Sequence, residues 1–225
     1  MIRMVVFDMA GTVINEGNVV YKTLLKAIND EGYRVSLAQV LLAGAGKEKF
    51  QAINDILKAY TDAGPAMARR VFANFKTLLA PAYDEMEIMS QPKAENLFQE
   101  LKNRKIYVVL NTGYDTKTAQ SMLSKVGWEE GKNIDALVTA GHVAHHRPHP
   151  DMIEFAKKRF DLKNSSEVIK VGDSAVDIEE GQNAKCRLCI GITTGAQSRE
   201  QLLAAKPDYV IDALSEVWPL IEKLN

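Results

Sequence analysis

The sequence has little of what marks membrane proteins or nucleic-acid-binding proteins. No apolar run reaches the ~18 residues that a helix needs to cross a bilayer. Neither sign of charge dominates, because 28 basic residues face 29 acidic ones. A strongly positive surface for nucleic acid is therefore not expected. The apolar N-terminus is interrupted by Arg3 and Asp8 and lacks the layout of a signal peptide. We expect a cytoplasmic protein with neither membrane nor nucleic acid as a partner.

Cysteine is also scarce, and the two residues present, Cys186 and Cys189, have the CxxC spacing. That spacing occurs in redox and zinc sites. A second pair that would complete a zinc site is absent from the sequence. Residues three apart on an extended strand also point to opposite faces. We therefore predict that both cysteines are structural.

Short apolar runs alternate with amphipathic segments along most of the chain. Buried parallel strands are predicted at Met4–Phe7, Ile106–Leu110, Val168–Val171, Leu188–Ile192 and Tyr209–Ile211. Helices are predicted at Ala94–Lys102, Thr116–Val126, Met152–Phe160, Ala175–Ala184 and Arg199–Ala205, with a last helix ending at Leu224. Strands that alternate with helices are typical of an α/β fold with a doubly wound, Rossmann-like parallel sheet.

One long stretch breaks this alternation. From Glu16 to Pro81 the periodicity is helical and no convincing strand is present, with Pro65 and Pro81 as expected helix boundaries. The helices predicted here cover residues 19–29, 37–42, 47–60 and 66–79. We therefore predict an all-helical cap domain at residues 16–83, inserted into a core domain formed by residues 1–15 and 84–225.

Polar residues follow three of the predicted strands at the point where each ends. Asp8 follows the first strand, Thr112 lies in a polar cluster after the second, and Asp173 follows the third. Ligands of open parallel sheets bind at the carboxyl ends of the strands, so these side chains are expected to converge. Asp177 lies one helical turn after Asp173 and can face the same side. Carboxylates brought together need a cation, and oxygen ligands favour magnesium.

Four segments resemble, in order, the motifs of haloacid dehalogenase-type hydrolases. These are Asp8 to Thr12, Thr112, Arg147, and Gly172 to Asp177. The resemblance covers most of the predicted core, and the helical insertion is similar to the cap of that family. It implies that this chain has the same fold and hydrolyses a small phosphorylated metabolite.

The resemblance also implies a role for each motif. Asp8 would attack phosphorus and form an acyl-phosphate intermediate. Magnesium would be held by Asp8, the backbone carbonyl of Ala10 and Asp173, with Asp177 in support. Thr112 and Arg147 would hold the phosphate oxygens. Taken alone, Thr112 would be read as a turn residue and Arg147 as a surface cation.

Residue 10 departs from the phosphatases of this family, which have a second aspartate there to protonate the leaving group. Ala10 cannot transfer a proton. The Asp-x-Ala-Gly-Thr pattern instead resembles the branch of phosphonoacetaldehyde hydrolase and its relatives. In that branch a cap lysine forms an imine with the substrate aldehyde, so that carbon leaves phosphorus as an enamine and the missing acid is not needed.

The segment from Ala43 to Lys47 resembles the Met-Gly-x-x-Lys segment of that branch and places Lys47 at the imine-forming position. Gly44 and Gly46 would let the cap backbone approach the substrate closely. The neighbouring Lys49 would favour a neutral Lys47 amine by like-charge repulsion. Two residues depart from the branch, because Ala43 stands in place of its methionine and Phe50 in place of its histidine.

The Thr112-Gly113-Tyr114 and Arg147-Pro148-x-Pro150 strings also resemble this branch, which makes Gly113 and Tyr114 expected substrate contacts. All four histidines fall between His142 and His149. Such density occurs in transition-metal sites, but the irregular segment favours solvent-facing loop histidines, and the carboxylates already account for a metal. His149 is singled out because it lies beside Arg147 and could approach the substrate as a proton donor.

The leading hypothesis is therefore a magnesium-dependent, phosphonatase-like hydrolase of a small phosphonate or phosphate metabolite. One alternative is a phosphate monoester phosphatase with a substitute general acid. Another is a non-catalytic protein that binds a phosphometabolite. Because relatives in this branch often pair through their caps, a homodimer is one expected assembly, although no residue pattern in this chain requires it.

Overall fold

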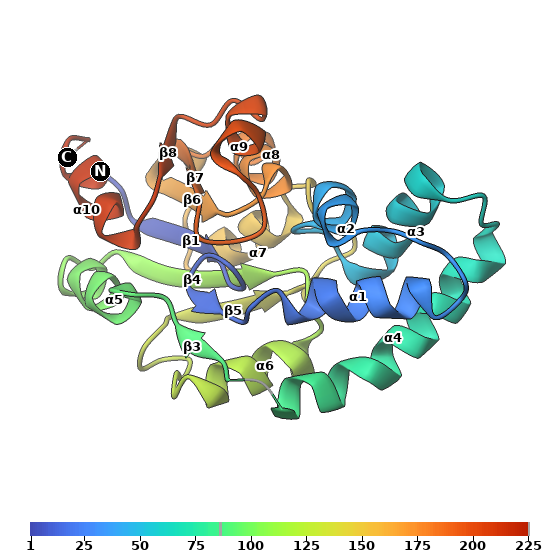
Figure 1. Cartoon of the computed structure of the whole chain (residues 1–225). Coiled ribbons are helices and arrows are strands. Elements are labelled where there is room, and N and C mark those ends of the chain that lie inside the picture. Colours follow the sequence, from blue (N-terminus) through green and yellow to red (C-terminus); the bar gives the residue numbers. More distant parts are fainter. Residues whose placement is uncertain (86, 225) are drawn as a thin grey trace.

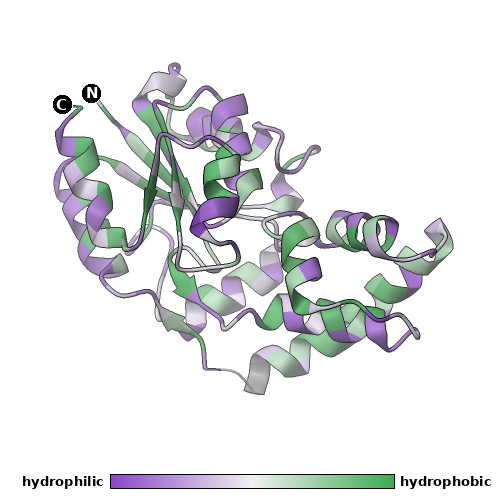
Figure 2. Cartoon of the chain, turned by 45° about the horizontal axis from the view of Figure 1, so that its top comes forward, coloured by the Kyte–Doolittle hydropathy of each residue, from purple (hydrophilic) through white to green (hydrophobic). Residues whose placement is uncertain are grey.

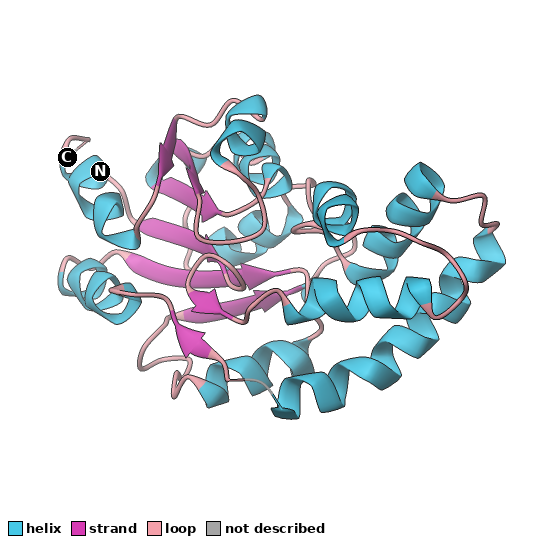
Figure 3. Ribbon diagram, in the orientation of Figure 1, coloured by secondary structure: helices cyan, strands magenta, loops and turns pink. Residues whose placement is uncertain are grey.

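A six-stranded parallel sheet forms the centre of the computed structural model, which describes residues 1–85 and 87–224 (Figures 1 and 3). Its strands are β1 (Met4–Asp8), β4 (Tyr107–Thr112), β5 (Ala136–Thr139), β6 (Val168–Gly172), β7 (Leu188–Ile192) and β8 (Tyr209–Ile211). Their order across the sheet is β5-β4-β1-β6-β7-β8. This order, with the chain running outward in both directions from β1, confirms the predicted doubly wound α/β core.

The register of the central strands brings three carboxyl ends to one edge of the sheet. In β1, Asp8 lies opposite Asn111 of β4, and Phe7 lies opposite both Leu110 of β4 and Val171 of β6. The residues that follow these strands therefore emerge side by side. The direction of strand order also changes at β1, which is where crevices form in sheets of this kind.

Alternate residues of β1 supply the two faces of the core. Val5 and Phe7 belong to the hydrophobic cluster that includes side chains of α5 (Ala94–Asn103), α6 (Thr116–Lys125) and α10 (Val217–Glu222). Met4 and Val6 face the other side, where they cluster with side chains of α7 (Asp151–Arg159). Helices α8 (Ala175–Asn183) and α9 (Arg199–Ala204) cover β7 on that same side. The strands are accordingly hydrophobic along most of their length (Figure 2).

Four helices extend from one side of the sheet and form the part predicted as a cap (Figure 1). They are α1 (Val19–Asn29), α2 (Leu37–Gly44), α3 (Lys49–Tyr60) and α4 (Pro65–Glu85). Helix α1 buries Val20, Leu24 and Ile28, which share one helical face, so α1 can pack against α4. Ser36 begins α2 with a reciprocal capping interaction with Gln39.

The predicted end of the last cap helix before Pro81 is wrong, because α4 continues through Pro81 to Glu85. Proline removes one intrahelical hydrogen bond, and that loss is tolerated here on the exposed side of the last helical turn. The predicted core range 84–225 also includes Met86 and Asn225, which lie outside the described residues. Among the described residues, no helix combines the length and the apolar character that a membrane span requires.

Three strands were not predicted. Strand β5 has only four residues, and it is defined by its pairing with β4, in which Thr139 lies opposite Thr112. Strands β2 (Ile14–Asn15) and β3 (Met89–Ser90) form an antiparallel pair where the chain leaves the sheet for the cap helices and returns. This short pair ties both connections between the two parts together.

Candidate active site

Three carboxylates meet at the carboxyl edge of the sheet. Asp8 ends β1, Asp173 follows β6, and Asp177 lies in the first turn of α8. One oxygen from each carboxylate lies within 4.8 Å of the oxygens of the other two, and all three side chains are buried. The structure thus brings together the predicted acidic residues, which are called the carboxylate cluster from here on.

Arg147 reaches into the carboxylate cluster from the loop before α7. Its Nη1 lies 2.6 Å from Asp8 Oδ1 and 2.9 Å from Asp177 Oδ1. Its Nε donates to Glu180 Oε2 at 3.0 Å, and its Nη2 donates to the Asn111 side-chain oxygen at 2.6 Å. With 1% of its surface exposed, Arg147 is not the surface cation that its type alone would suggest. The guanidinium plane is held by four partners, so its position beside Asp8 is well defined.

Lys170 and Glu180 complete this arrangement and were missed by the sequence reasoning. Lys170 Nζ lies 2.9 Å from Asp177 Oδ1 and 3.2 Å from Glu180 Oε2, and it donates to Asn111 Oδ1 at 2.7 Å. Both side chains are completely buried. A lysine inside the apolar run of β6 was the available signal, because charged groups are seldom buried without partners. Glu180 follows Asp177 by three residues and so shares its helical face.

The surroundings shift the pKa values of the acidic residues in different directions. Burial raises the pKa of Asp8 and the charge of Asp177 adds to this, whereas Arg147 and Lys170 oppose it. Burial, followed by the charges of Asp8 and Asp177, raises the pKa of Asp173 well above its ordinary value. Burial also opposes ionisation of Asp177, but Arg147 and Lys170 outweigh burial and lower its pKa. The carboxylate that faces both basic groups is therefore the most readily ionised.

The charges of these residues fit a divalent cation. Together with Glu180, the carboxylate cluster sets four negative charges against the two positive charges of Arg147 and Lys170. Two negative charges stay uncompensated when all of these groups are ionised. The donor atoms of the cluster are carboxylate oxygens, which suit magnesium better than a transition metal. The predicted ligands Asp8, Ala10, Asp173 and Asp177 are thus compatible with magnesium, and their roles stay a prediction.

The loop after β1 and the loop after β7 are connected around Asp173. Asp173 Oδ2 accepts a hydrogen bond from the Ala196 backbone N–H at 2.6 Å. The Thr194 hydroxyl donates to the backbone oxygen of Gly11 at 2.6 Å. Ala10 lies between Asp8 and this anchored Gly11. Its side chain is a methyl group, so residue 10 offers the site no transferable proton.

Of the two glycines expected to let the cap backbone approach, Gly46 contacts the core and Gly44 packs within the cap. A Cβ atom on Gly46 would overlap the Ser174 hydroxyl oxygen, and Gly46 N donates to the Tyr21 hydroxyl at 2.9 Å. Gly44 packs inside the cap instead, where an added Cβ would lie 3.0 Å from Ile56 Cδ1. The reason is that Gly44 is the last residue of α2 and faces α3, whereas Gly46 lies in the connection between these helices.

Gly113 forms the core side of this close approach. A Cβ atom at Gly113 would lie 2.8 Å from the backbone oxygen of Lys47. The neighbouring Thr112 is buried, and its hydroxyl oxygen accepts a hydrogen bond from the Tyr114 backbone N–H at 3.3 Å. The loop after β4 and the segment before α3 therefore contact each other through their backbones.

The two lysines at this junction have different surroundings. The Lys47 ammonium lies 2.5 Å from Asp55 Oδ2, in an ion pair within the cap. Lys49 is buried, and its Nζ lies over the rings of Tyr21 and Tyr114. Lys49 was expected only to influence Lys47, yet it is the lysine that faces the junction of cap and core. Tyr114, predicted as a substrate contact, is buried beneath it.

His149, predicted as a proton donor to the substrate, lies in an exposed turn, and its role stays a prediction. Its side chain is exposed, and its ring lies 5.3 Å from that of His145, measured between ring centroids. A turn in which His149 N donates to His146 O directs the chain outward immediately after Arg147. His142 and His145 are exposed as well, in keeping with a solvent-facing loop.

Comparisons with known proteins agree with this geometry. A model of the haloacid dehalogenase-like hydrolases matches residues 2–185. The chain is 27% identical over 226 residues to pyrophosphatase PpaX of Bacillus mycoides, covering 100% of this chain and 99% of the relative. It is 27% identical over 261 residues to a phosphonoacetaldehyde hydrolase of Latilactobacillus sakei, covering 99% and 96%.

The fold also matches a solved structure, that of a phosphonoacetaldehyde hydrolase-like protein from Oleispira antarctica. The TM-score is 0.84 at 21% sequence identity, and the match covers 99% of this chain and 92% of that one. The family match covers residues 2–185, and within it Asp8 ends β1, Asp173 follows β6, and Arg147 lies beside Asp8. The chain therefore belongs to the haloacid dehalogenase-like hydrolases.

Proposed function

We propose that this hydrolase transfers the phosphoryl group of a small phosphate or phosphonate metabolite to Asp8 and then to water, with magnesium bound at the carboxylate cluster. The observation that carries the proposal is the position of Asp8. Its carboxylate ends β1 at the crevice of the sheet and lies 2.6 Å from the buried guanidinium of Arg147. A nucleophile for phosphorus needs such a setting, with fixed positive charge beside the attacking oxygen.

The residues of the site divide the chemistry between them. Asp8 forms the acyl phosphate, and Arg147 holds phosphate oxygens together with Thr112. Lys170 holds the Asp177 side chain, and Asn111 holds the side chains of both Arg147 and Lys170. These contacts fix the orientation of the charged groups in the site. Magnesium, when bound, supplies the positive charge that offsets the charge of the phosphoryl group. The contact between Gly113 and the cap backbone limits the entry of water.

The bond that is broken depends on what replaces an acid at Ala10. In one form of the proposal, a phosphate ester is hydrolysed with a substitute acid. In the other, Lys47 forms an imine with a phosphonoaldehyde and a carbon–phosphorus bond breaks. The likeness to phosphonoacetaldehyde hydrolases supports the second form. The ion pair between Lys47 and Asp55 favours the first, because the Lys47 amine must leave its carboxylate partner before it can react.

A magnesium-dependent activity panel tests the proposal. The substrates are aryl phosphates, alkyl phosphates, pyrophosphate and phosphonoacetaldehyde, each assayed with Asp8→Asn as the control. Turnover should require magnesium, and Asp8→Asn should lower it by about 10⁴-fold or more, since the nucleophile is lost. If neither protein hydrolyses any substrate, the alternative of a non-catalytic phosphometabolite-binding protein gains. Equal turnover by both proteins would rule out Asp8 as the nucleophile.

Trapping with borohydride separates the two forms of the proposal. Borohydride reduces an imine to a stable secondary amine, and peptide mapping then locates the modified lysine. With phosphonoacetaldehyde present, the imine form predicts an adduct on Lys47. Turnover of phosphonoacetaldehyde without any such adduct would exclude it.

On the balanced charge of the chain we further propose a cytoplasmic enzyme that binds neither membranes nor nucleic acid.

A further inference from the structure

Lys49, at the start of α3, is a buried cation in the junction between cap and core. Its side chain is 8% exposed, and its Nζ donates to the Lys47 backbone oxygen at 2.9 Å. Among the described residues, no carboxylate forms an ion pair with Lys49. A buried lysine normally has such a partner. The ammonium group therefore has hydrogen-bonding capacity left for a ligand.

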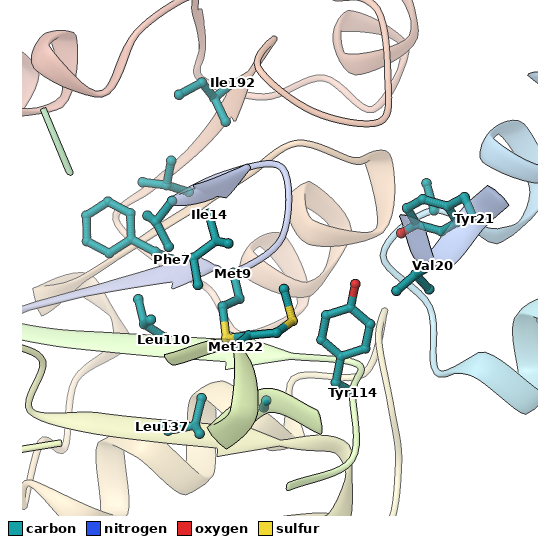
Figure 4. Packing of buried hydrophobic residues seen from close by; sticks show 14 of the residues in the cluster. Phe7, Met9, Ile14, Val20, Tyr21, Leu110, Tyr114, Met122, Leu137 and Ile192 are labelled. Carbon is teal, nitrogen blue, oxygen red and sulfur yellow. The ribbon is translucent and has the colours of Figure 1, made fainter. Parts of the chain in front are cut away.

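Two tyrosines position the Lys49 ammonium. Its Nζ lies 4.9 Å from the centroid of the Tyr114 ring and 5.3 Å from that of the Tyr21 ring. Tyr114 comes from the loop after β4 and Tyr21 comes from α1 (Figure 4). The faces of aromatic rings attract a cation. One ring from each part therefore holds the ammonium where cap and core meet.

The charges around Lys49 couple it to the reacting centre. Burial lowers the pKa of Lys49 to about 8, and the charge with the largest opposing effect is that of Asp8. Arg147 lowers this pKa further, whereas Glu48 and Glu16 raise it. A group that titrates near neutral pH transfers protons efficiently.

Lys49 also lines a cavity that can receive a leaving group. The cavity has a volume of about 410 Å³, and its walls include Phe72, Phe75, Leu79 and Tyr114. These side chains come from α4 and from the loop after β4, so the cavity lies between cap and core. Glu48, Lys76, Asp115 and His146 also line the cavity, but most of its wall is apolar, which suits the carbon skeleton of an alcohol.

We propose that Lys49 donates the proton to the leaving group, in place of the acid that Ala10 cannot supply, and that the substrate is a phosphate ester whose apolar alcohol portion enters this cavity. The inference rests on the proposed phosphoryl transfer to Asp8. As the Asp8 oxygen bonds to phosphorus and the phosphorus–oxygen ester bond breaks, a proton passes from the Lys49 ammonium to the departing oxygen. The products of this step are the alcohol, a neutral Lys49 amine and the acyl phosphate. Water then hydrolyses the acyl phosphate, and the proton released recharges Lys49.

The test compares substrates whose leaving groups need a proton to different degrees. Alkyl phosphates need one, whereas p-nitrophenyl phosphate releases a stable anion. Lys49→Met should lower kcat/KM for alkyl phosphates by about 10²- to 10⁴-fold and affect p-nitrophenyl phosphate much less. Lys49→Arg keeps the charge but cannot give up a proton, so the same selectivity is expected. The matched control is Lys58→Met, an exposed lysine on the same helix, which should leave both activities unchanged.

A pH profile of the wild-type protein gives a second measurement that does not depend on a variant folding. Turnover of alkyl phosphates should fall above pH about 8, as Lys49 loses its proton. Turnover of p-nitrophenyl phosphate should lack this decline. The same decline for both substrates would overturn the proposal, and so would equal losses of both activities in Lys49→Met, which indicate a structural role. If the wild-type protein hydrolyses nothing, the proposed function itself fails; if it is active with unchanged selectivity in the variants, only the role of Lys49 fails.

Discussion

Replacing Arg147 by methionine shows how strongly the buried charges hold the site together. The guanidinium is 1% exposed and lies within 3.0 Å of oxygens of Asp8, Asp177 and Glu180. Methionine fills much of the same space without any donor. Asp8 then keeps no direct cationic partner among the described residues, while Asp177 and Glu180 keep only Lys170. The variant therefore leaves buried negative charge that water cannot solvate.

The size of the effect follows from this geometry. Removing one partner of a buried ion pair typically costs roughly 3–5 kcal/mol. In a chain of this length each kcal/mol lowers Tm by roughly 2–4 °C, so Arg147→Met should lower Tm by about 6–20 °C at pH 8. Burial raises the pKa of Asp8 and Arg147 opposes this, so without Arg147 the Asp8 carboxylate binds a proton more readily as the pH falls, which removes its charge. The difference in stability from wild type should therefore shrink between pH 8 and pH 5.

Thermal unfolding followed by circular dichroism at both pH values measures this difference. The matched control is Arg159→Met, because Arg159 pairs with Glu130 at 2.5 Å while both side chains are at least 40% exposed. Exposed pairs contribute about 0–1 kcal/mol, so the control should change Tm little. The reasoning is refuted if Arg147→Met is no more destabilising than Arg159→Met, or if its effect does not depend on pH.

Three further outcomes follow from the structure. Burial, together with neighbouring negative charge, raises the pKa of Asp173. The contribution of protonated Asp173 to the stability of the metal-free protein is therefore present at low pH and lost as the pH rises through that pKa. Magnesium should accordingly raise Tm more at pH 8 than at pH 5, and Asp173→Asn should abolish most of this rise in a thermal-shift assay. Gly113→Ala places a Cβ atom 2.8 Å from the Lys47 backbone oxygen and should lower kcat/KM with little loss of Tm, whereas Gly64→Ala, where nothing lies within 4 Å, should preserve kcat/KM. Burial raises the pKa of the Cys189 thiol, so iodoacetamide should alkylate it much more slowly in the folded protein than in urea.

The core could be predicted because three of its strands are apolar runs that end in polar residues. Asp8, Thr112 and Asp173 each follow such a run, and parallel pairing alone brings them to one edge. Strands β2 and β3 could not be found in this way. Each has two residues, and only the pairing of Ile14 with Ser90, far apart in sequence, makes them strands.

The cap side of the site was less predictable, since it depends on where one helix begins. The expected helix started at Lys47, whereas α3 begins at Lys49 after Glu48 caps its first turn. With about 100° of rotation per residue, this start decides which side chain turns toward the core. Lys47 consequently pairs with Asp55 inside the cap, and Lys49 faces Tyr114. The resemblance to a family segment identified the lysine-bearing stretch, and the catalytic role of either lysine stays a proposal.

The central claim, that Asp8 receives the phosphoryl group, is tested most directly by trapping the intermediate. The wild-type protein is quenched in acid during turnover of its best phosphate substrate with magnesium, and peptide mass mapping locates any phosphoryl group. The account predicts one phosphoryl group on the peptide that contains Asp8, and none in Asp8→Asn. A phosphoryl group on another residue of the actively turning over protein would contradict it.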